Sequence, residues 1–257
     1  MGFAKTKPED FARALLSRLG TKQPANLDDV ARAIGLRVRK VNSKGFEGAL
    51  VRVPGMARGI VAVRADIREL GRERFTVAHE IGHYVLPGHG ATSPVCRDEQ
   101  IEAWGQGATR QEDAANRFAS ELLLPSEQIG PVVRERSASI GTARFISDEF
   151  KTSLTAAALK CVEVTEDACA LVVSVDGVVR RCRTSRSWGY VIPAGCTLAR
   201  GTLARHLDLE ERQASGTVSA SAWAVSKSMT TGAELLEDSI YLPRYNTVLS
   251  ILTAIGA

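Results

Sequence analysis

The segment 79–83 reads HEIGH, an HExxH pattern whose residue types suit metal-assisted hydrolysis. Residues four apart lie on one face of a helix, so His79 and His83 are positioned to bind one tetrahedral Zn²⁺ side by side. Glu80 could take a proton from a water held there, because Zn²⁺ lowers the pKa of that water to about 7. The chain has only four histidines, which makes a chance match improbable. The sequence therefore predicts a metal site for peptide hydrolysis.

Two histidines leave a third protein ligand to find, and the residues offer two candidates. His89 completes a metzincin-type H-E-x-x-H-x5-H spacing, but Leu86 stands where that class has the glycine at which the chain turns. Glu112 lies on a second predicted helix whose small alanines permit close packing. Its side chain also fits a capping box that begins at Thr109, which would engage it with a backbone N–H. The residue pattern leaves both candidates open.

Helical periodicity surrounds both of these segments. We expect helices over 72–86 and 109–124, with Pro125 and Pro131 ending the second. Two further helices are expected within 137–163. The helix over 72–86 would carry His79 and His83, and the helix over 109–124 would carry Glu112.

The N-terminal residues predict helices followed by a small sheet. The apolar spacing and end signals favour a helix over 8–20 and a short helix that begins after Asn26. Alternation then indicates three strands, of which the last two would form a hairpin around Pro54-Gly55: 36–41, 48–53 and 59–63.

From Cys169 onward the pattern changes to strands. An Asp176-Gly177 turn joins the first two, and residues 243–255 fit either a strand or a helix. The strand candidates are 170–175, 178–183, 190–192, 217–225 and 239–242. This change places a domain boundary near residue 165.

Two stretches of this sequence resemble the ImmA/IrrE family of metallopeptidases. The first is FTVAHEIGH over 75–83, and the second is EDAANRFASELLLP over 112–125, which is similar to that family's E-x-x-A-N-x-F-A-x-x-L-L-x-P signature. The resemblance covers about residues 8–165, and the remaining residues are similar to tails found on some members.

The resemblance implies an intracellular, gluzincin-like zinc protease. Mapped by motif, His79, His83 and Glu112 would be the metal ligands and Glu80 the catalytic base. Known targets of the family are helix-turn-helix repressors, whose cleavage relieves repression in stress or mobile-element responses. The helices within 137–163 resemble the small helical subdomain that follows the protease core, and residues 150–155 look like a helix-turn-helix turn.

Composition bounds the remaining classes of function. Thirty-three Lys and Arg against 29 Asp and Glu give a net charge of +4, which permits nucleic-acid binding without favouring it. Apolar runs such as Ala170 to Val173 are far shorter than the ~20 residues that span a bilayer, and no secretory signal is visible. Five cysteines form no CxxC pair, which favours free thiols in the reducing cytoplasm.

We therefore expect an α+β protein in three parts: a zincin-like zinc metallopeptidase core with a small mixed sheet over 1–130, a helical, helix-turn-helix-like subdomain over 131–165, and a β-rich, regulatory domain over 166–257. The expected function is Zn²⁺-dependent cleavage of a partner protein, a helix-turn-helix repressor, with no role for a membrane. The alternative is a DNA- or repressor-binding regulator, or an antitoxin-type partner, with little proteolytic activity. The complete HExxH argues against it, because a purely structural site has no use for Glu80.

Overall fold

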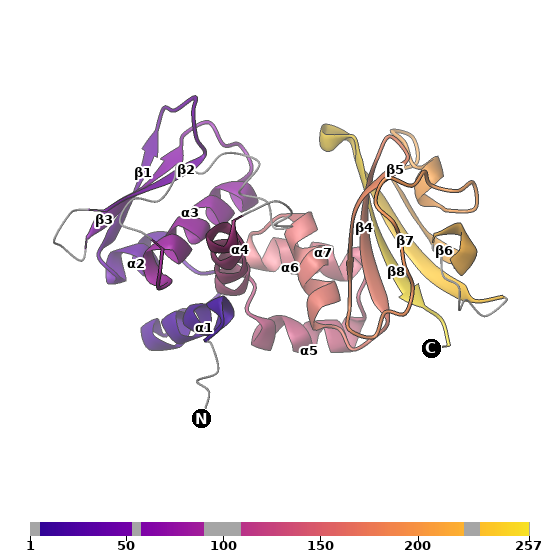
Figure 1. Ribbon diagram of the computed structural model, residues 1–257, viewed down its shortest axis with the longest axis horizontal. Helices are drawn as coiled ribbons and strands as arrows, with labels where there is room; N and C mark the ends of the chain where they lie inside the picture. Colours follow the sequence, from indigo (N-terminus) through magenta and orange to yellow (C-terminus); the bar gives the residue numbers. More distant parts are fainter. Residues whose placement is uncertain (1–5, 53–57, 90–108, 224–231, 257) are drawn as a thin grey trace. The chain divides into compact units, whose positions relative to one another are not determined.

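The computed structural model describes residues 6–52, 58–89, 109–223 and 232–256. The chain forms two compact units, one of residues 1–125 and 147–156 and the other of 126–146 and 157–257. Each unit combines helices with its own sheet, which confirms the expected α+β class (Figure 1). The division into a metallopeptidase core over 1–130, a helical subdomain over 131–165 and a regulatory domain over 166–257 stays a prediction.

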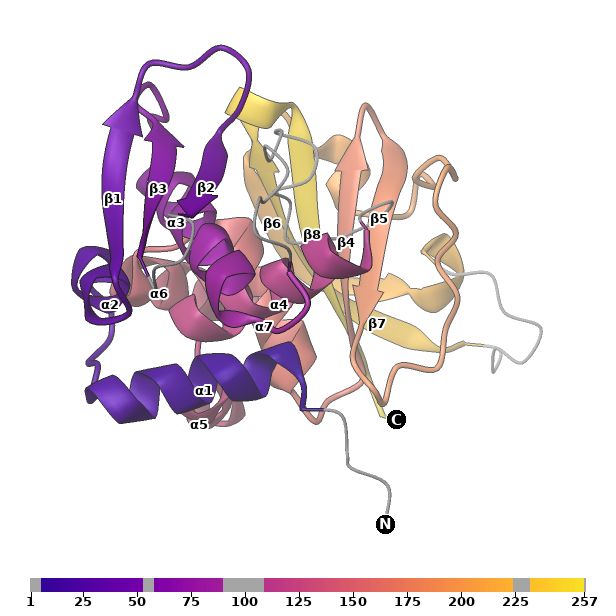
Figure 2. The same ribbon diagram turned by 60° about the vertical axis from the view of Figure 1, so that its left-hand side comes forward.

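A three-stranded sheet lies in the first unit, made by β1 (Leu36–Val41), β2 (Gly48–Arg52) and β3 (Gly59–Arg64). Its order is β1-β3-β2, with β1 parallel and β2 antiparallel to β3, so the sheet is mixed (Figure 2). The expected pairing of the last two strands is present, while Pro54-Gly55 lies outside the described residues.

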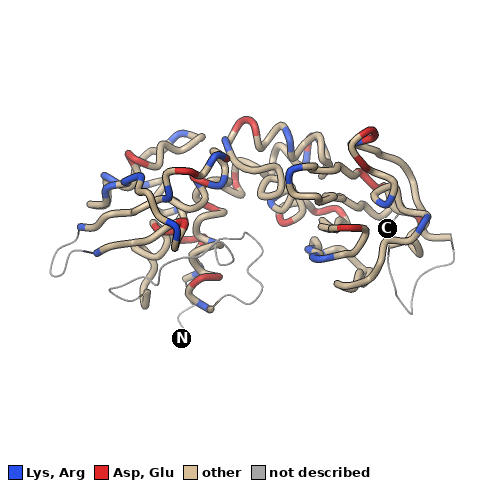
Figure 3. The backbone as a smooth tube through the Cα atoms, turned by 90° about the horizontal axis from the view of Figure 1, so that it is seen from above, with Lys and Arg blue, Asp and Glu red and all other residues tan. Residues whose placement is uncertain are grey.

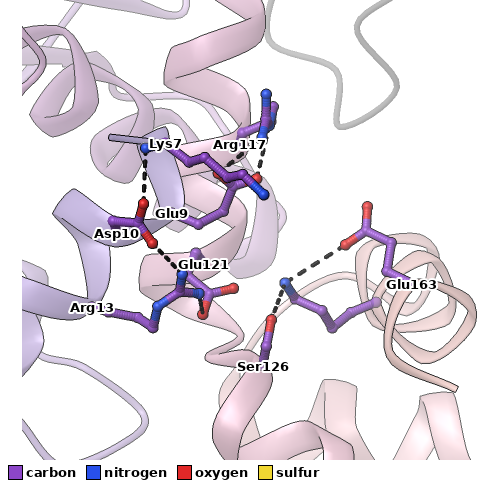
Figure 4. A network of polar contacts seen from close by, with 9 residues as sticks. Lys7, Glu9, Asp10, Arg13, Arg117, Glu121, Ser126 and Glu163 are labelled. Atoms are coloured by element: carbon purple, nitrogen blue, oxygen red, sulfur yellow. Dashed lines mark hydrogen bonds and ion pairs between the residues drawn. The ribbon is translucent and has the colours of Figure 1, made fainter. Parts of the chain in front are cut away.

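Four helices complete most of the first unit: α1 (Pro8–Leu19), α2 (Leu27–Ala33), α3 (Leu70–Val85) and α4 (Arg110–Leu123). Helix α1 ends at Gly20, whose φ of 58° lies in the left-handed region that favours glycine. Two ion pairs join α1 to α4 (Figure 4): Arg13 with Glu121 at 3.0 Å, and Arg117 with Glu9 at 2.8 Å. These contacts hold α1 against the helix that carries Glu112.

Helix α5 (Ser126–Arg136) corrects one expectation, because it begins directly after Pro125 and contains Pro131. Proline lacks the N–H of a helical hydrogen bond and normally disfavours the interior of a helix. Burial of Ile129 and Val133, which are at most 2% exposed, offsets that cost. The two further helices expected nearby are α6 (Ile140–Phe150) and α7 (Leu154–Val164).

The second unit contains a five-stranded antiparallel sheet in the order β5-β4-β8-β7-β6. Its strands are β4 (Cys169–Val175), β5 (Val178–Thr184), β6 (Gln213–Ser219), β7 (Glu234–Leu242) and β8 (Thr247–Ala254). Residues 243–255 thus supply a strand, preceded by the short 3₁₀ helix η3 (Pro243–Tyr245). The expected strand at 190–192 is wrong, since those residues form a loop whose Tyr190 packs on the core. The strand expected at 217–225 lies earlier, at 213–219.

One face of this sheet is covered by the connection between β5 and β6, which includes the 3₁₀ helix η1 (Ala204–His206). A carboxylate of the sheet also caps the first residue of α6, which lies in the same unit, because Oδ2 of Asp238 accepts a hydrogen bond from the Ile140 N–H at 2.8 Å. In the part of the chain that the structure describes, no helix is both long and apolar enough to cross a membrane.

Candidate metal centre

Helices α3 and α4 bring the three predicted metal ligands together. The Nε2 atoms of His79 and His83 are 3.0 Å apart, and Glu112 places Oε2 3.0 Å from the first and Oε1 3.4 Å from the second. All three side chains are at most 2% exposed. Among the described residues, they form the one His, Cys, Asp and Glu group that could hold a metal ion.

These distances fit a tetrahedral metal site. Zinc–nitrogen bonds of about 2.0–2.1 Å at tetrahedral angles separate neighbouring ligand atoms by about 3.3 Å. The observed separations of 3.0–3.4 Å lie within a few tenths of that value. Two imidazoles and one carboxylate are also a donor set that zinc commonly takes in catalytic sites.

A hydrogen bond on the far side of each imidazole orients it. Nδ1 of His79 lies 2.8 Å from Oδ1 of Asn116, and Nδ1 of His83 lies 2.8 Å from Nδ1 of His89. Protons on the two Nδ1 atoms satisfy Asn116 and His89 as acceptors and leave both Nε2 lone pairs directed toward Glu112. Three electron-rich atoms then converge in a buried space, and a cation resolves their mutual repulsion.

The charge states of the surrounding groups support this arrangement. Burial raises the pKa of the Glu112 carboxyl, but hydrogen bonds from His79 and His83, formed when their Nε2 atoms carry a proton in place of a metal ion, outweigh burial and lower the pKa to about 2. Burial, assisted by the neighbouring His83, lowers the pKa of His89 to about 4, so this imidazole is neutral at pH 7. Glu112 thus offers an anionic donor to the candidate centre, and His89 is an acceptor beside it rather than a member of the group of three that could hold a metal ion.

The close approach of α3 and α4 depends on small residues, as their spacing suggested. A Cβ on Gly82 would lie 3.0 Å from the Phe118 ring and 3.3 Å from the Ala115 backbone. A side chain at position 82 would therefore require Phe118 and the Ala115 backbone to give by a few tenths of an ångström, close to Glu112 on the same helix.

Glu80 lies on α3 between the two histidines in sequence, and its side chain is fully buried. It faces strand β2, because a Cβ on Gly48 would lie 2.8 Å from its Oε1 and 2.6 Å from Cγ2 of Thr76. Glycine at position 48 therefore lets the strand pass directly over the carboxylate. This contact confines Glu80 to a narrow space beside the metal ligands.

Two anchors hold β2 along α3, and neither was apparent from the sequence. Just before the strand, the buried Glu47 forms ion pairs with Arg64 and Arg72, both at 2.8 Å. At the end of the strand, Nη2 of Arg52 donates to the His83 carbonyl oxygen at 2.6 Å. The Glu and Arg residues of these anchors are dispersed in the sequence and form no motif. The sequence could have indicated Asn116, since it lies one helical turn after Glu112.

Comparison with known proteins places this geometry in a family. A family model described as the IrrE N-terminal-like domain, a peptidase family, matches residues 31–161, just over half of the chain. The chain belongs to this family of metallopeptidase-like proteins, which confirms the resemblance seen in its motifs. The curated proteins give no match.

Among solved structures, the chain is similar to a Mycobacterium tuberculosis transcriptional regulator with a TM-score of 0.64 and 12% sequence identity. The match covers 96% of this chain and 76% of that one. At this level of identity the likeness establishes the fold alone.

Proposed function

We propose that this chain is a zinc-dependent endopeptidase that hydrolyses a peptide bond in a helix-turn-helix transcriptional repressor. The observation that carries the proposal is the convergence of His79, His83 and Glu112 at 3.0–3.4 Å, with Glu80 buried beside them on α3. Three converging ligands are typical of catalytic zinc sites, which keep a fourth position for water, whereas structural sites close all four with protein.

The residues of the centre have separate roles in this proposal. When bound, Zn²⁺ supplies Lewis-acid polarisation of the scissile carbonyl and of the attacking water. Glu80 takes the proton of that water and transfers it to the leaving amine. Asn116 and His89 hold the two imidazoles in one tautomer and orientation, and Gly48 keeps the Glu80 carboxylate from turning away.

The choice of a repressor as substrate rests on the family and on its implied targets. Members of the IrrE-like family are metallopeptidase-like proteins, and the structural relative is itself described as a transcriptional regulator. The described cysteines, Cys161, Cys169, Cys182 and Cys196, are free, which supports a cytoplasmic location beside such a substrate. Cleavage would relieve repression in a stress or mobile-element response.

Direct nucleic-acid binding is not favoured by the helices that resemble a helix-turn-helix. Helix α7 would be the recognition helix, yet residues 157–162 are all buried. Its Lys160 is 3% exposed and contacts Ser126 at 3.2 Å and Glu163 at 3.6 Å (Figure 4). Along both units, Lys and Arg are interspersed with Asp and Glu rather than gathered in a basic stripe (Figure 3).

The proposal is tested by incubating the purified protein with the helix-turn-helix repressor encoded beside its gene. We expect two fragments with defined ends in mass spectrometry, no cleavage after chelation, and recovery on addition of Zn²⁺. A repressor that is bound but stays intact in the zinc-loaded sample would instead support the alternative of a binding regulator.

A further inference from the structure

A cavity of about 200 Å³ lies at one end of the five-stranded sheet, and all of its lining residues belong to the second unit. Its floor is a cross-strand row in which Val248 of β8 pairs with Ser174 of β4 and with Tyr241 of β7. Its wall is the connection that contains η1, and the β4–β5 turn forms part of its rim. The cavity is therefore built from segments that are distant in the sequence.

A buried carboxylate fixes the wall of this cavity. Glu237 is fully buried and accepts hydrogen bonds from the N–H groups of Leu203 at 3.0 Å and Ala204 at 2.6 Å. The same carboxylate accepts from Nε1 of Trp223 at 2.6 Å and from the Ser239 hydroxyl at 2.9 Å. Four donors on one carboxylate hold η1 in place, so the cavity is formed before any molecule enters it.

A buried hydroxyl lines the floor. Ser174 is 2% exposed, and its side chain has no hydrogen-bond partner among the residues that the structure describes. Because Ser174 lines the cavity, a polar group that enters the cavity can pair with its hydroxyl. The position of Ser174 on the cavity floor makes a bound polar group its natural partner.

The cavity also presents charges of both signs. Arg205 donates from Nη1 to the Leu198 carbonyl oxygen at 2.9 Å, which leaves the rest of its donor fork for a ligand. The carboxylates of Asp176 and Asp208 line the same space. Each uses Oδ1 in its hydrogen bonds, Asp176 with Asn246 at 2.6 Å and Asp208 with backbone N–H groups at 2.7 and 3.0 Å. Both side chains are exposed where they line the cavity, so they can pair with a cationic group there.

We propose that this cavity binds a free α-amino acid with an apolar side chain. Arg205 and Ser174 would hold its carboxylate, and Asp176 and Asp208 its ammonium group, while Leu198, Leu207 and Val248 provide apolar surface for the side chain. A ligand of one charge alone would leave the opposite charges of the lining unmatched. This site is separate from the metal centre, and its occupancy does not depend on peptidase activity.

The first experiment measures binding to the full-length protein by calorimetry and by the shift of its melting temperature. The probes are leucine, isoleucine, valine and methionine at up to 10 mM, because a ligand that binds only the folded state raises its melting temperature. For the tightest of them we also test the matched amine, which lacks the carboxylate, and the matched carboxylic acid, which lacks the amino group. We expect both to bind at least about tenfold more weakly. Absence of binding by all four amino acids, or an amine that binds equally well, would overturn the proposal.

The second experiment compares variants that retain the fold. Arg205→Gln should weaken amino-acid binding at least about tenfold, since it removes a charge-assisted hydrogen bond to the ligand carboxylate. Arg212→Gln is the matched control, because Arg212 also donates to a backbone carbonyl, that of Leu209 at 3.3 Å, but does not line the cavity. Ser174→Val should abolish binding by filling the floor and removing the hydroxyl. Equal affinities in Arg205→Gln and Arg212→Gln would contradict the assignment.

Discussion

Asn116 provides a sharp test of how the metal centre is organised. Its Oδ1 lies 2.8 Å from Nδ1 of His79, and the residue is 4% exposed, so water cannot readily replace it. In Asn116→Ala the imidazole loses this acceptor, and a buried unpaired N–H costs about 1–3 kcal/mol. Loss of such an orienting partner typically lowers metal affinity about 10- to 100-fold, or about 1.4–2.7 kcal/mol. The two magnitudes agree, so we expect a zinc dissociation constant that is 10- to 100-fold higher.

Competition with a chromophoric chelator measures this dissociation constant without any substrate. Asn116→Asp keeps an acceptor at the same position and adds a negative charge, so it should bind zinc at least as tightly as the unmodified chain. Gln111→Ala is the control on the same helix, since Gln111 is exposed and donates to the Gly88 carbonyl oxygen rather than to a ligand. A folded Asn116→Ala protein with unchanged zinc affinity would refute the orienting role.

Three further predictions concern Gly48, the third metal ligand and the buried thiol of Cys161. Gly48→Ala puts a carbon 2.8 Å from Oε1 of Glu80, the proposed base, so cleavage should fall about 10- to 100-fold while zinc is retained. The control Gly45→Ala, whose added carbon meets nothing within 4 Å, should cleave at the normal rate. Equal cleavage rates in the two variants would contradict the role of the Gly48 contact. Zinc measured by atomic emission should fall sharply in folded Glu112→Ala and stay near one per chain in His89→Ala, and the opposite pattern would make His89 the ligand. Burial raises the pKa of Cys161 from 9.0 to about 12, so above pH 9 the unfolded chain releases this proton before the folded one does. The free energy of unfolding should therefore fall more steeply with pH than in Cys161→Ala, by up to about 1.4 kcal/mol per pH unit, and parallel urea-unfolding profiles between pH 9 and 10.5 would contradict this.

The sequence predicted the helices of the metal centre well, because their apolar periodicity is strong and uninterrupted. It could not decide the role of Glu112, since one pattern fits both a capping box and a metal ligand. The structure separates the two: Oγ of Thr109 accepts from the Glu112 N–H at 3.3 Å, while the Glu112 side chain turns to the histidines. The backbone N–H of Glu112 is used in the helix cap, which leaves its side chain for the proposed role as a metal ligand, and spacing alone does not reveal this division.

Elements that depend on distant contacts were harder to predict. Helix α5 forms although Pro131 lies inside it and was expected to end a helix, because burial of its apolar face outweighs the low helix propensity of proline. The contact of Gly48 with Glu80 joins a strand to a helix 32 positions away, and no local sequence pattern predicts it. The β-rich character of the C-terminal residues was evident from alternation, but the ends of β6 and the loop at 190–192 depend on packing across the sheet.

Glu80→Gln tests the central claim most directly. The substitution keeps the size of a fully buried side chain and removes its capacity to take a proton. We expect a folded protein with one zinc per chain that cleaves the partner repressor about 100-fold more slowly or worse. Cleavage at the unmodified rate by the zinc-loaded Glu80→Gln protein would contradict it.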